Sequence, residues 1–384
     1  MRQSSETGKK LSGRERVKTA LNHQEGDRFP IDLGMQFSTG ISAFAYYNLR
    51  TYLGLSTDKI EIVDNVQMLA RVDQDVLDLF HCDTVLLYPP YKKQMLWNVR
   101  DDYSFIIPEQ MNPRMEDGYW VVTRGDEKMR MPRNGFFFDG SWIRIVDGPP
   151  EDEILVLARE AERLEKETDK YTCLLNHFLA FFTGIEMACD MLTDPDSVKA
   201  FNEDLLKKQT GKFMRFVKNG GRDIDCIEFN SDLGMQSGPM LSPDCYEEFV
   251  LPYMKELIRV IHENSGARVF LHCCGSVFSL IPHLIEAGLD ILNPVQISAD
   301  NMDPAELKKT YGDKINFWGG GCNTQKILGF KDEAAVRENV RMLSTTFKPG
   351  GGFVFNQVHN IMGDVPPQNI VAMFDEAYKN SFYE

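Results

Sequence analysis

Two short turns in this chain carry residue types that bind soft metal ions. The first, Leu-His-Cys-Cys-Gly at 271–275, ends an apolar run and contains His272 and Cys274. The second, Trp-Gly-Gly-Gly-Cys at 318–322, follows another apolar run and ends at Cys322. If both runs are parallel strands of one barrel, their carboxyl ends lie on the same rim. His272, Cys274 and Cys322 would then form an imidazole and two-thiol set suited to Zn²⁺, with one position open.

The spacing supports this set but leaves an alternative open. His272 and Cys274 are two residues apart, so on a regular strand their side chains point to the same side. The rule weakens beyond the strand's end at Gly275. An open zinc site with two thiolates indicates activation of a thiol substrate. The alternative is that all three residues are buried core side chains in a chain with eight cysteines.

Other polar side chains follow predicted strands at the same rim. We expect Glu228 and Asp232 to complete the zinc shell, orient an imidazole or act on substrate, although Asp232 could equally cap a turn. His359 ends the last predicted strand, where we expect a catalytic role. Polar residues that we expect to contact a cofactor follow two of the strands: Asn293, Gln296 and Gln325.

Short apolar runs alternate with amphipathic stretches, and this alternation predicts the fold. The runs lack strict alternation, as expected for strands that are covered on both faces. Eight strand–helix alternations favour an α/β (β/α)₈ TIM barrel over an open doubly wound sheet. The predicted strands are 29–32, 84–88, 173–175, 226–229, 268–272, 290–293, 315–318 and 353–356.

Helix signals lie between these runs. Ser12 is followed three residues later by Glu15, which is the pattern of a capping box. Ser242 before Pro243 is typical of a helix start. The last two helices are expected to run from Asp332 to Ser344 and from Pro366 to Lys379.

One region departs from the barrel pattern. Between about 89 and 149 the sequence alternates around polar turns, which predicts antiparallel hairpins. We therefore expect a small antiparallel β insertion on a βα loop, at the catalytic rim. Residues 1–11 are expected to be a flexible tail, and 12–384 to form a single barrel domain that contains the insertion.

Composition excludes several classes of partner. The 384 residues include 57 acidic and 42 basic side chains, for a net charge of -15. This balance disfavours nucleic acids and anionic membranes as partners. The chain has no apolar stretch long enough to cross a bilayer and no secretory signal, so we expect a cytoplasmic protein. Its cysteines are then thiols or ligands rather than disulfides.

Several motifs together resemble the uroporphyrinogen decarboxylase-like superfamily. Arg-Glu-Arg-Val-Lys-Thr-Ala-Leu-Asn-His at 14–23 and Asp-Arg-Phe-Pro at 27–30 look like its opening. The resemblance continues through Gly-Pro-Met-Leu-Ser-Pro at 238–243, Leu-His-Cys-Cys-Gly at 271–275 and Trp-Gly-Gly-Gly at 318–321. It ends with His359-Asn360-Ile361 and with 364–370.

The resemblance implies a (β/α)₈ barrel with its active site on the rim, and two kinds of chemistry. True decarboxylases hold the acidic side chains of a porphyrinogen with an arginine-rich N-terminal segment, but the matching stretch here, 31–40, contains no arginine. The corrinoid-dependent methyltransferases resemble this chain in their His-x-Cys pattern, which His272 and Cys274 match. In the familiar members the last cysteine ligand lies near the final strand, whereas Cys322 lies one strand earlier.

The resemblance therefore favours a zinc-dependent methyltransferase of a corrinoid (cobalamin) system. Methyl groups would move between a small methyl donor or thiol-type acceptor and methylcobalamin carried by a separate corrinoid protein. One alternative is a metal-free lyase that acts on a tetrapyrrole or another carboxylate. Another is a non-enzymatic corrinoid-binding partner whose cysteines are inert. Barrels of this type often dimerise, so a homodimer is possible.

Overall fold

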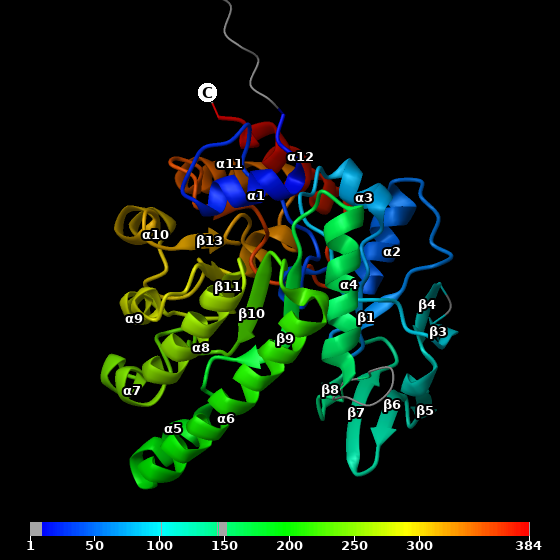
Figure 1. Cartoon of the computed structure of the whole chain (residues 1–384). Helices are drawn as coiled ribbons and strands as arrows, with labels where there is room; N and C mark the ends of the chain where they lie inside the picture. The colour runs from blue at the N-terminus through cyan, green and yellow to red at the C-terminus, as the bar shows by residue number, and fades with distance from the viewer. Residues whose placement is uncertain (1–9, 101, 144, 146–151, 384) are drawn as a thin grey trace, which may run out of the picture.

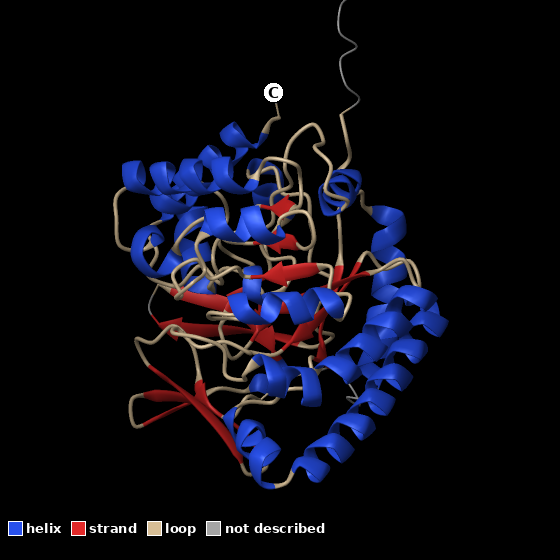
Figure 2. Cartoon of the chain, turned by 90° about the vertical axis from the view of Figure 1, so that its left-hand side faces the viewer, coloured by secondary structure: helices blue, strands red, loops and turns tan. Residues whose placement is uncertain are grey.

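A parallel sheet forms the centre of the molecule. The computed structural model describes residues 10–100, 102–143, 145 and 152–383. Six strands pair in the order β14-β13-β12-β11-β10-β9, and every pair is parallel. Figure 2 shows these strands in the middle with helices around them. The strands are β9 Cys173–Leu179, β10 Cys226–Asn230, β11 Arg268–His272, β12 Ile291–Asn293, β13 Asn316–Trp318 and β14 Phe353–Val354.

Two shorter segments link the edges of this sheet. Parallel bridges pair Ile31 with Phe355, just after β14, and Thr84 with Tyr171, just before β9. The two segments also contact each other, because the amide of Asp83 donates a 2.8 Å hydrogen bond to the carbonyl of Ile31. Eight segments thus surround the interior, which is the arrangement of an α/β barrel.

The predicted strands are confirmed to different extents. β11 covers the predicted residues 268–272, and the other five strands from 173 onward lie within a few residues of their expected positions. The expected strands at 29–32 and 84–88 form single bridges instead. Pro30 stands in the middle of the first and has no N–H to donate, which prevents a continuous ladder.

Helices cover the outside of the sheet and begin where the sequence indicates. Ser12 caps the first helix through a capping box with Glu15. Ser242 accepts a hydrogen bond from the amide of Cys245, with Pro243 at the first position of its helix. The α-helices are α1 Gly13–Leu21, α2 Ala43–Tyr52, α3 Gln74–Leu79, α4 Glu153–Glu167, α5 Ile185–Thr193, α6 Pro195–Phe216, α7 Pro243–Phe249, α8 Leu251–Asn264, α9 Ile281–Glu286, α10 Pro304–Tyr311, α11 Glu333–Phe347 and α12 Pro367–Ser381.

Antiparallel strands occupy the region where an insertion was predicted. One hairpin pairs β3 with β4, and a second sheet has the order β5-β6-β7-β8. Figure 1 shows this second sheet at the lower right, at the opposite end of the molecule from α1, α11 and α12. These strands are β3 Gln94–Arg100, β4 Tyr103–Pro108, β5 Arg114–Glu116, β6 Tyr119–Arg124, β7 Glu127–Pro132 and β8 Asp139–Gly140.

A further antiparallel pair precedes the insertion. β1 Ile62–Asp64 pairs with β2 Leu69–Ala70, and β1 ends at a carboxylate that lies near the barrel mouth. Most of the predicted tail, residues 1–9, lies outside the described residues, as do 146–149 at the end of the predicted insertion. Among the helices of the described ranges, none combines the length and apolar character needed to cross a membrane.

Candidate functional site

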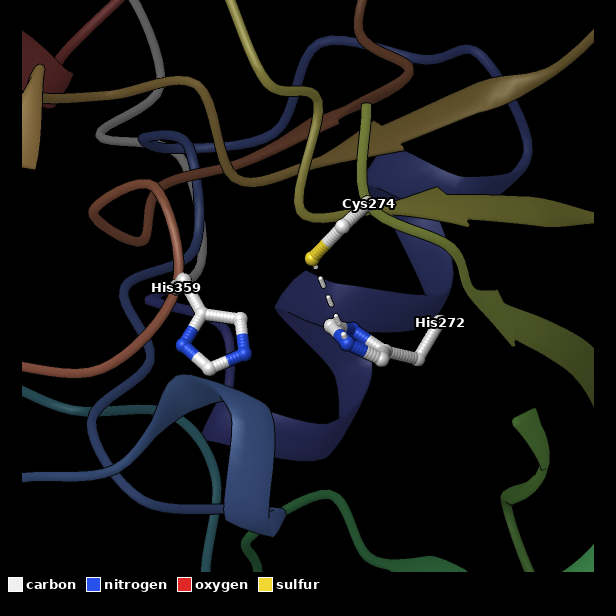
Figure 3. A group of neighbouring side chains, drawn as sticks. All are labelled: His272, Cys274 and His359. Carbon is white, nitrogen blue, oxygen red and sulfur yellow. Dashed lines mark hydrogen bonds between the residues drawn. The ribbon is translucent and has the colours of Figure 1, made fainter. Parts of the chain in front are cut away.

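Three side chains converge at the mouth of the barrel. His272, Cys274 and His359 each offer one donor atom, and these atoms all lie within 4.8 Å of one another. The Sγ atom of Cys274 is 3.7 Å from Nε2 of His272, and the two imidazole rings have centroids 5.3 Å apart. Figure 3 shows the thiol and both rings facing a common space.

Local backbone geometry positions the three donors. His272 is the last residue of β11, and Cys274 follows in a turn that continues through Gly275. Gly275 has φ +89°, and a Cβ there would lie 2.4 Å from the carbonyl carbon of Gly234, so only glycine fits. His359 has φ +63°, which is uncommon for a residue other than glycine. Such strain concentrates at functional sites.

Cys322 does not join this group. Its side chain is fully buried in the hydrophobic core. Gly319 and Gly320 adopt positive φ after β13 and turn the chain. The carbonyl of Cys322 then accepts a hydrogen bond from the amide of Val358. The structure thus places His359, for which we predicted a catalytic role, where the predicted set had a second thiol.

The chemistry of the three donors fits zinc. With a Zn–N distance of about 2.0 Å and a Zn–S distance of about 2.3 Å, a tetrahedral site holds N and S about 3.5 Å apart, close to the 3.7 Å between Nε2 of His272 and Sγ of Cys274. Burial lowers the pKa of His272. It lowers the pKa of His359 to about 4, with a further contribution from His272. Both rings are therefore neutral at pH 7 and have lone pairs for a metal.

Two members of the group, His272 and His359, line a large cavity. The cavity has a volume of about 450 Å³, within the range of small-molecule sites. Four residues expected at the site line it, namely Glu228, Asp232, His272 and His359. Its complete described lining is Phe37, Ser38, Asp64, Gln67, Trp142, Asn176, Glu228, Asn230, Asp232, His272 and His359.

The two predicted carboxylates occupy different environments. Glu228 is 2% exposed, and its Oε2 accepts a 2.7 Å hydrogen bond from the amide of Asn176. Asp232 is exposed to the cavity, and its Oδ1 accepts a 2.9 Å hydrogen bond from the amide of Cys274. Asp232 is thus tied to the turn that carries the thiol, while Glu228 lies deeper in β10.

The three residues expected to contact a cofactor differ in their positions. Asn293 is fully buried and hydrogen-bonds to His272 rather than lining the cavity. Gln296 accepts a 2.8 Å hydrogen bond from the amide of Gly275. Gln325 is exposed and accepts a hydrogen bond from the hydroxyl of Ser298. Cofactor contact by Asn293, Gln296 and Gln325 stays a prediction.

Sequence reasoning did not find several residues of the wall. Phe37 and Ser38 come from the short helix η1, Phe37–Thr39, and Trp142 from the region after β8. Together with Tyr88 and Tyr91, Phe37 and Trp142 also line a small recess of about 30 Å³ beside the main cavity. The positions of these aromatic residues follow no period. Only Phe37 and Ser38 lie in a segment that the sequence comparison singled out, the arginine-free stretch 31–40.

Comparisons with known proteins agree with this architecture. The solved structure of a methyltransferase from Methanosarcina mazei covers 96% of this chain and 99% of its own, with a TM-score of 0.59 and 13% identity. That likeness shows the fold. Among curated relatives, uroporphyrinogen decarboxylase from Aeromonas salmonicida (strain A449) is 30% identical over 194 residues, which is 49% of each chain. The corresponding enzyme from Citrobacter koseri is 25% identical over 197 residues.

A match to a family model shows the family of this chain, because it covers far more of the sequence than any single motif. The chain spans between 38% and 64% of the length of these curated relatives. A family model described as uroporphyrinogen decarboxylase (URO-D) matches residues 186–380, just over half of the chain. This range holds β10 to β14 and all three donors of the candidate metal group. The chain belongs to the uroporphyrinogen decarboxylase family.

Proposed function

We propose that this protein is a zinc-dependent methyltransferase of a corrinoid methyl-transfer system. The observation that carries the proposal is the convergence of His272, Cys274 and His359 within 4.8 Å of one another, with both histidines lining a 450 Å³ cavity. Catalytic zinc sites use three protein ligands and keep a further position for substrate. A group of this composition that faces a cavity supports a catalytic rather than a structural metal.

The side chains have separable roles in this proposal. His272, Cys274 and His359 would hold the ion, which when bound supplies a Lewis acid for a thiol acceptor or for the heteroatom of a methyl donor. Asp232 borders the cavity and can accept a proton from a substrate there. Glu228 is buried behind it and orients the polar wall through Asn176.

We further propose that the corrinoid arrives on a partner protein that docks at the mouth of the cavity. Trp142 lines that mouth and is 67% exposed. Large exposed aromatic side chains are favoured in interfaces because they bury much apolar surface. A cytoplasmic location is part of the proposal, supported by eight free thiols. Association into a homodimer also stays a proposal.

The test combines metal content with methyl transfer. Zinc is measured by elemental analysis on purified protein and on the C274A and H359A variants. The proposal predicts about one zinc per chain in the parent protein and loss of zinc in both variants. Methyl transfer is then followed by the absorbance change between methylcobalamin and cob(I)alamin, with thiols, methyl ethers and methylamines as partners. Equal zinc content in all three proteins would exclude the site.

Uroporphyrinogen decarboxylation is the second candidate, because the curated relatives carry that name. The wall itself disfavours it. The stretch 31–40 contributes Phe37 and Ser38 to the cavity, and it has no arginine to pair with the carboxylates of a porphyrinogen. Incubation of the metal-free protein with uroporphyrinogen distinguishes the candidates, since release of carbon dioxide would favour decarboxylation.

A further inference from the structure

The amide of Asn293 lies directly behind the first imidazole of the metal group. Asn293 ends β12, next to the end of β11, and its backbone pairs with that of His272 in the sheet. Its Oδ1 lies 2.7 Å from Nδ1 of His272. The same oxygen accepts a 2.9 Å hydrogen bond from the hydroxyl of Ser38. The side chain is fully buried.

The carbonyl of Trp318 determines which way this amide points. The Nδ2 of Asn293 donates a 3.0 Å hydrogen bond to that carbonyl. A carbonyl oxygen can only accept, so the reversed amide would bring two oxygens together and break this bond. The hydrogen-bond network therefore assigns Oδ1, and not Nδ2, to the side that faces His272.

The orientation of the amide in turn fixes the proton on His272. Because Oδ1 can only accept, Nδ1 of His272 must carry the hydrogen. The neutral ring then has its lone pair on Nε2, the atom that lies 3.7 Å from Sγ of Cys274. This is the nitrogen that faces the other two donors in Figure 3.

The amide is itself held by the interior of the barrel. Trp318 is fully buried, and its indole Nε1 donates a 2.9 Å hydrogen bond to Oδ2 of Asp32. The other oxygen of Asp32 accepts a 2.6 Å hydrogen bond from the hydroxyl of Thr84. A continuous chain of contacts thus runs from the segments that bridge the sheet edges to the imidazole at the mouth.

We propose that Asn293 is a positioning residue that keeps His272 in the Nδ1–H tautomer with Nε2 directed at the metal group. Partners of this kind orient a ligating histidine and raise its basicity. The zinc part of the inference rests on the proposed function. The tautomer part concerns the metal-free protein and stands apart from it.

The first experiment measures the tautomer without metal. Protein with ¹⁵N-labelled histidine is stripped of metal, and long-range ¹H–¹⁵N spectra are recorded, with the His272 signals assigned by their loss in H272Q. We expect the Nδ1–H form in the parent protein. The N293L variant removes the acceptor, so the Nε2–H form should appear. The N293D variant keeps an acceptor oxygen for Nδ1 but loses the donor to the carbonyl of Trp318, so it should keep the parent tautomer at a cost in stability. An unchanged tautomer in N293L would overturn the proposal.

The second experiment measures zinc affinity by competition with a chromophoric chelator. We expect N293L to bind zinc about 10- to 100-fold more weakly, and N293D, which keeps the acceptor for Nδ1, to bind more tightly than N293L. Asn316 provides the matched control, because it is also a buried strand asparagine and donates to the carbonyls of Leu21 and Asp290. The N316A variant should lose stability but keep the parent zinc affinity.

The outcomes separate the two proposals. Parent-like zinc affinity in N293L, with the fold intact by circular dichroism, would overturn the positioning role while leaving the zinc site in place. If neither the parent protein nor any variant binds zinc, the proposed function fails. The tautomer spectra alone then test whether Asn293 positions His272. If N293L does not fold, S38A gives the milder test. It removes one of the two hydrogen bonds to Oδ1 and should lower zinc affinity by a smaller factor, so parent-like zinc affinity in S38A would then overturn the proposal.

Discussion

The backbone amide of Cys274 donates a 2.9 Å hydrogen bond to Oδ1 of Asp232. The carboxylate that follows β10 therefore holds the turn after β11, and the thiol keeps its direction toward His272. Neighbouring parallel strands make this possible, since Asn230 and His272 are register partners at the ends of β10 and β11.

This contact predicts a difference between two substitutions of Asp232. The D232N variant keeps an oxygen that can accept from the amide of Cys274, whereas D232A loses it. We expect D232A to weaken zinc binding by about tenfold, as for other contacts that support metal ligands, and D232N to weaken it less. Isothermal titration of metal-free protein with zinc measures both. Equal affinities in parent and D232A would show that the hydrogen bond does not hold the turn.

The metal group predicts opposite results for two candidate third ligands. The H359A variant should lose zinc because it removes one of three donors. The C322A variant should retain zinc, because that thiol is buried in the core. The C322A substitution should instead lower the unfolding free energy by about 1 kcal/mol, because it leaves a small cavity in the core. Zinc analysis and urea denaturation distinguish the two effects, and loss of zinc in C322A would restore the set expected from sequence.

Gly275 is predicted to tolerate no side chain. A Cβ at this position would lie 2.4 Å from the backbone of Gly234, and φ is +89°. We expect G275A to lose about 2–4 kcal/mol of unfolding free energy and to bind zinc poorly, because the turn that carries Cys274 must move. The matched control is G238A, where an added Cβ meets nothing within 4 Å. Similar denaturation midpoints for the two variants would contradict this account.

Trp142 is predicted to act in binding rather than in folding. With 67% of its surface exposed, W142A should change the unfolding free energy by no more than about 0.5 kcal/mol. Because the side chain lines the cavity, the same variant should weaken binding of substrate or corrinoid protein by about tenfold. The control is L192A, which removes a 79% exposed side chain from α5. Equal binding by both variants would remove Trp142 from the site.

The environment of the Asp290 carboxyl predicts that the unfolding free energy depends on pH. Burial opposes ionisation of this carboxyl, but hydrogen bonds from His262, Val269 and Arg268 outweigh it, so its pKa lies below the ordinary value of 3.8. A carboxyl whose pKa is lower in the folded than in the unfolded protein stabilises the fold at pH values above its unfolded pKa. This stabilisation is lost as the pH falls through the pKa of the folded protein. Because His262 and Arg268 are partly exposed, we expect D290N to be only about 1–2 kcal/mol less stable at pH 7, with a smaller difference near pH 3. Urea denaturation across this range measures it, and a constant difference would refute the linkage.

Much of the architecture could be predicted from local sequence. The buried runs at 226–229 and 268–272 became β10 and β11, because continuous apolar segments between helices suit strands covered on both faces. Ser12 and Ser242 capped helices as expected, since capping depends on neighbouring residues alone. The pair His272 and Cys274 was also visible in sequence, because two residues at the end of one strand share a direction.

Only the tertiary structure decided the rest of the site. His359 reaches the group through a left-handed backbone conformation after β14, while three glycines take Cys322 into the core. Neither turn can be calculated from spacing, because each depends on packing against segments distant in sequence. The same holds for Asn293, which looked like a cofactor contact. The positioning role proposed for Asn293 depends on the carbonyl of Trp318, which only the tertiary structure places beside its amide.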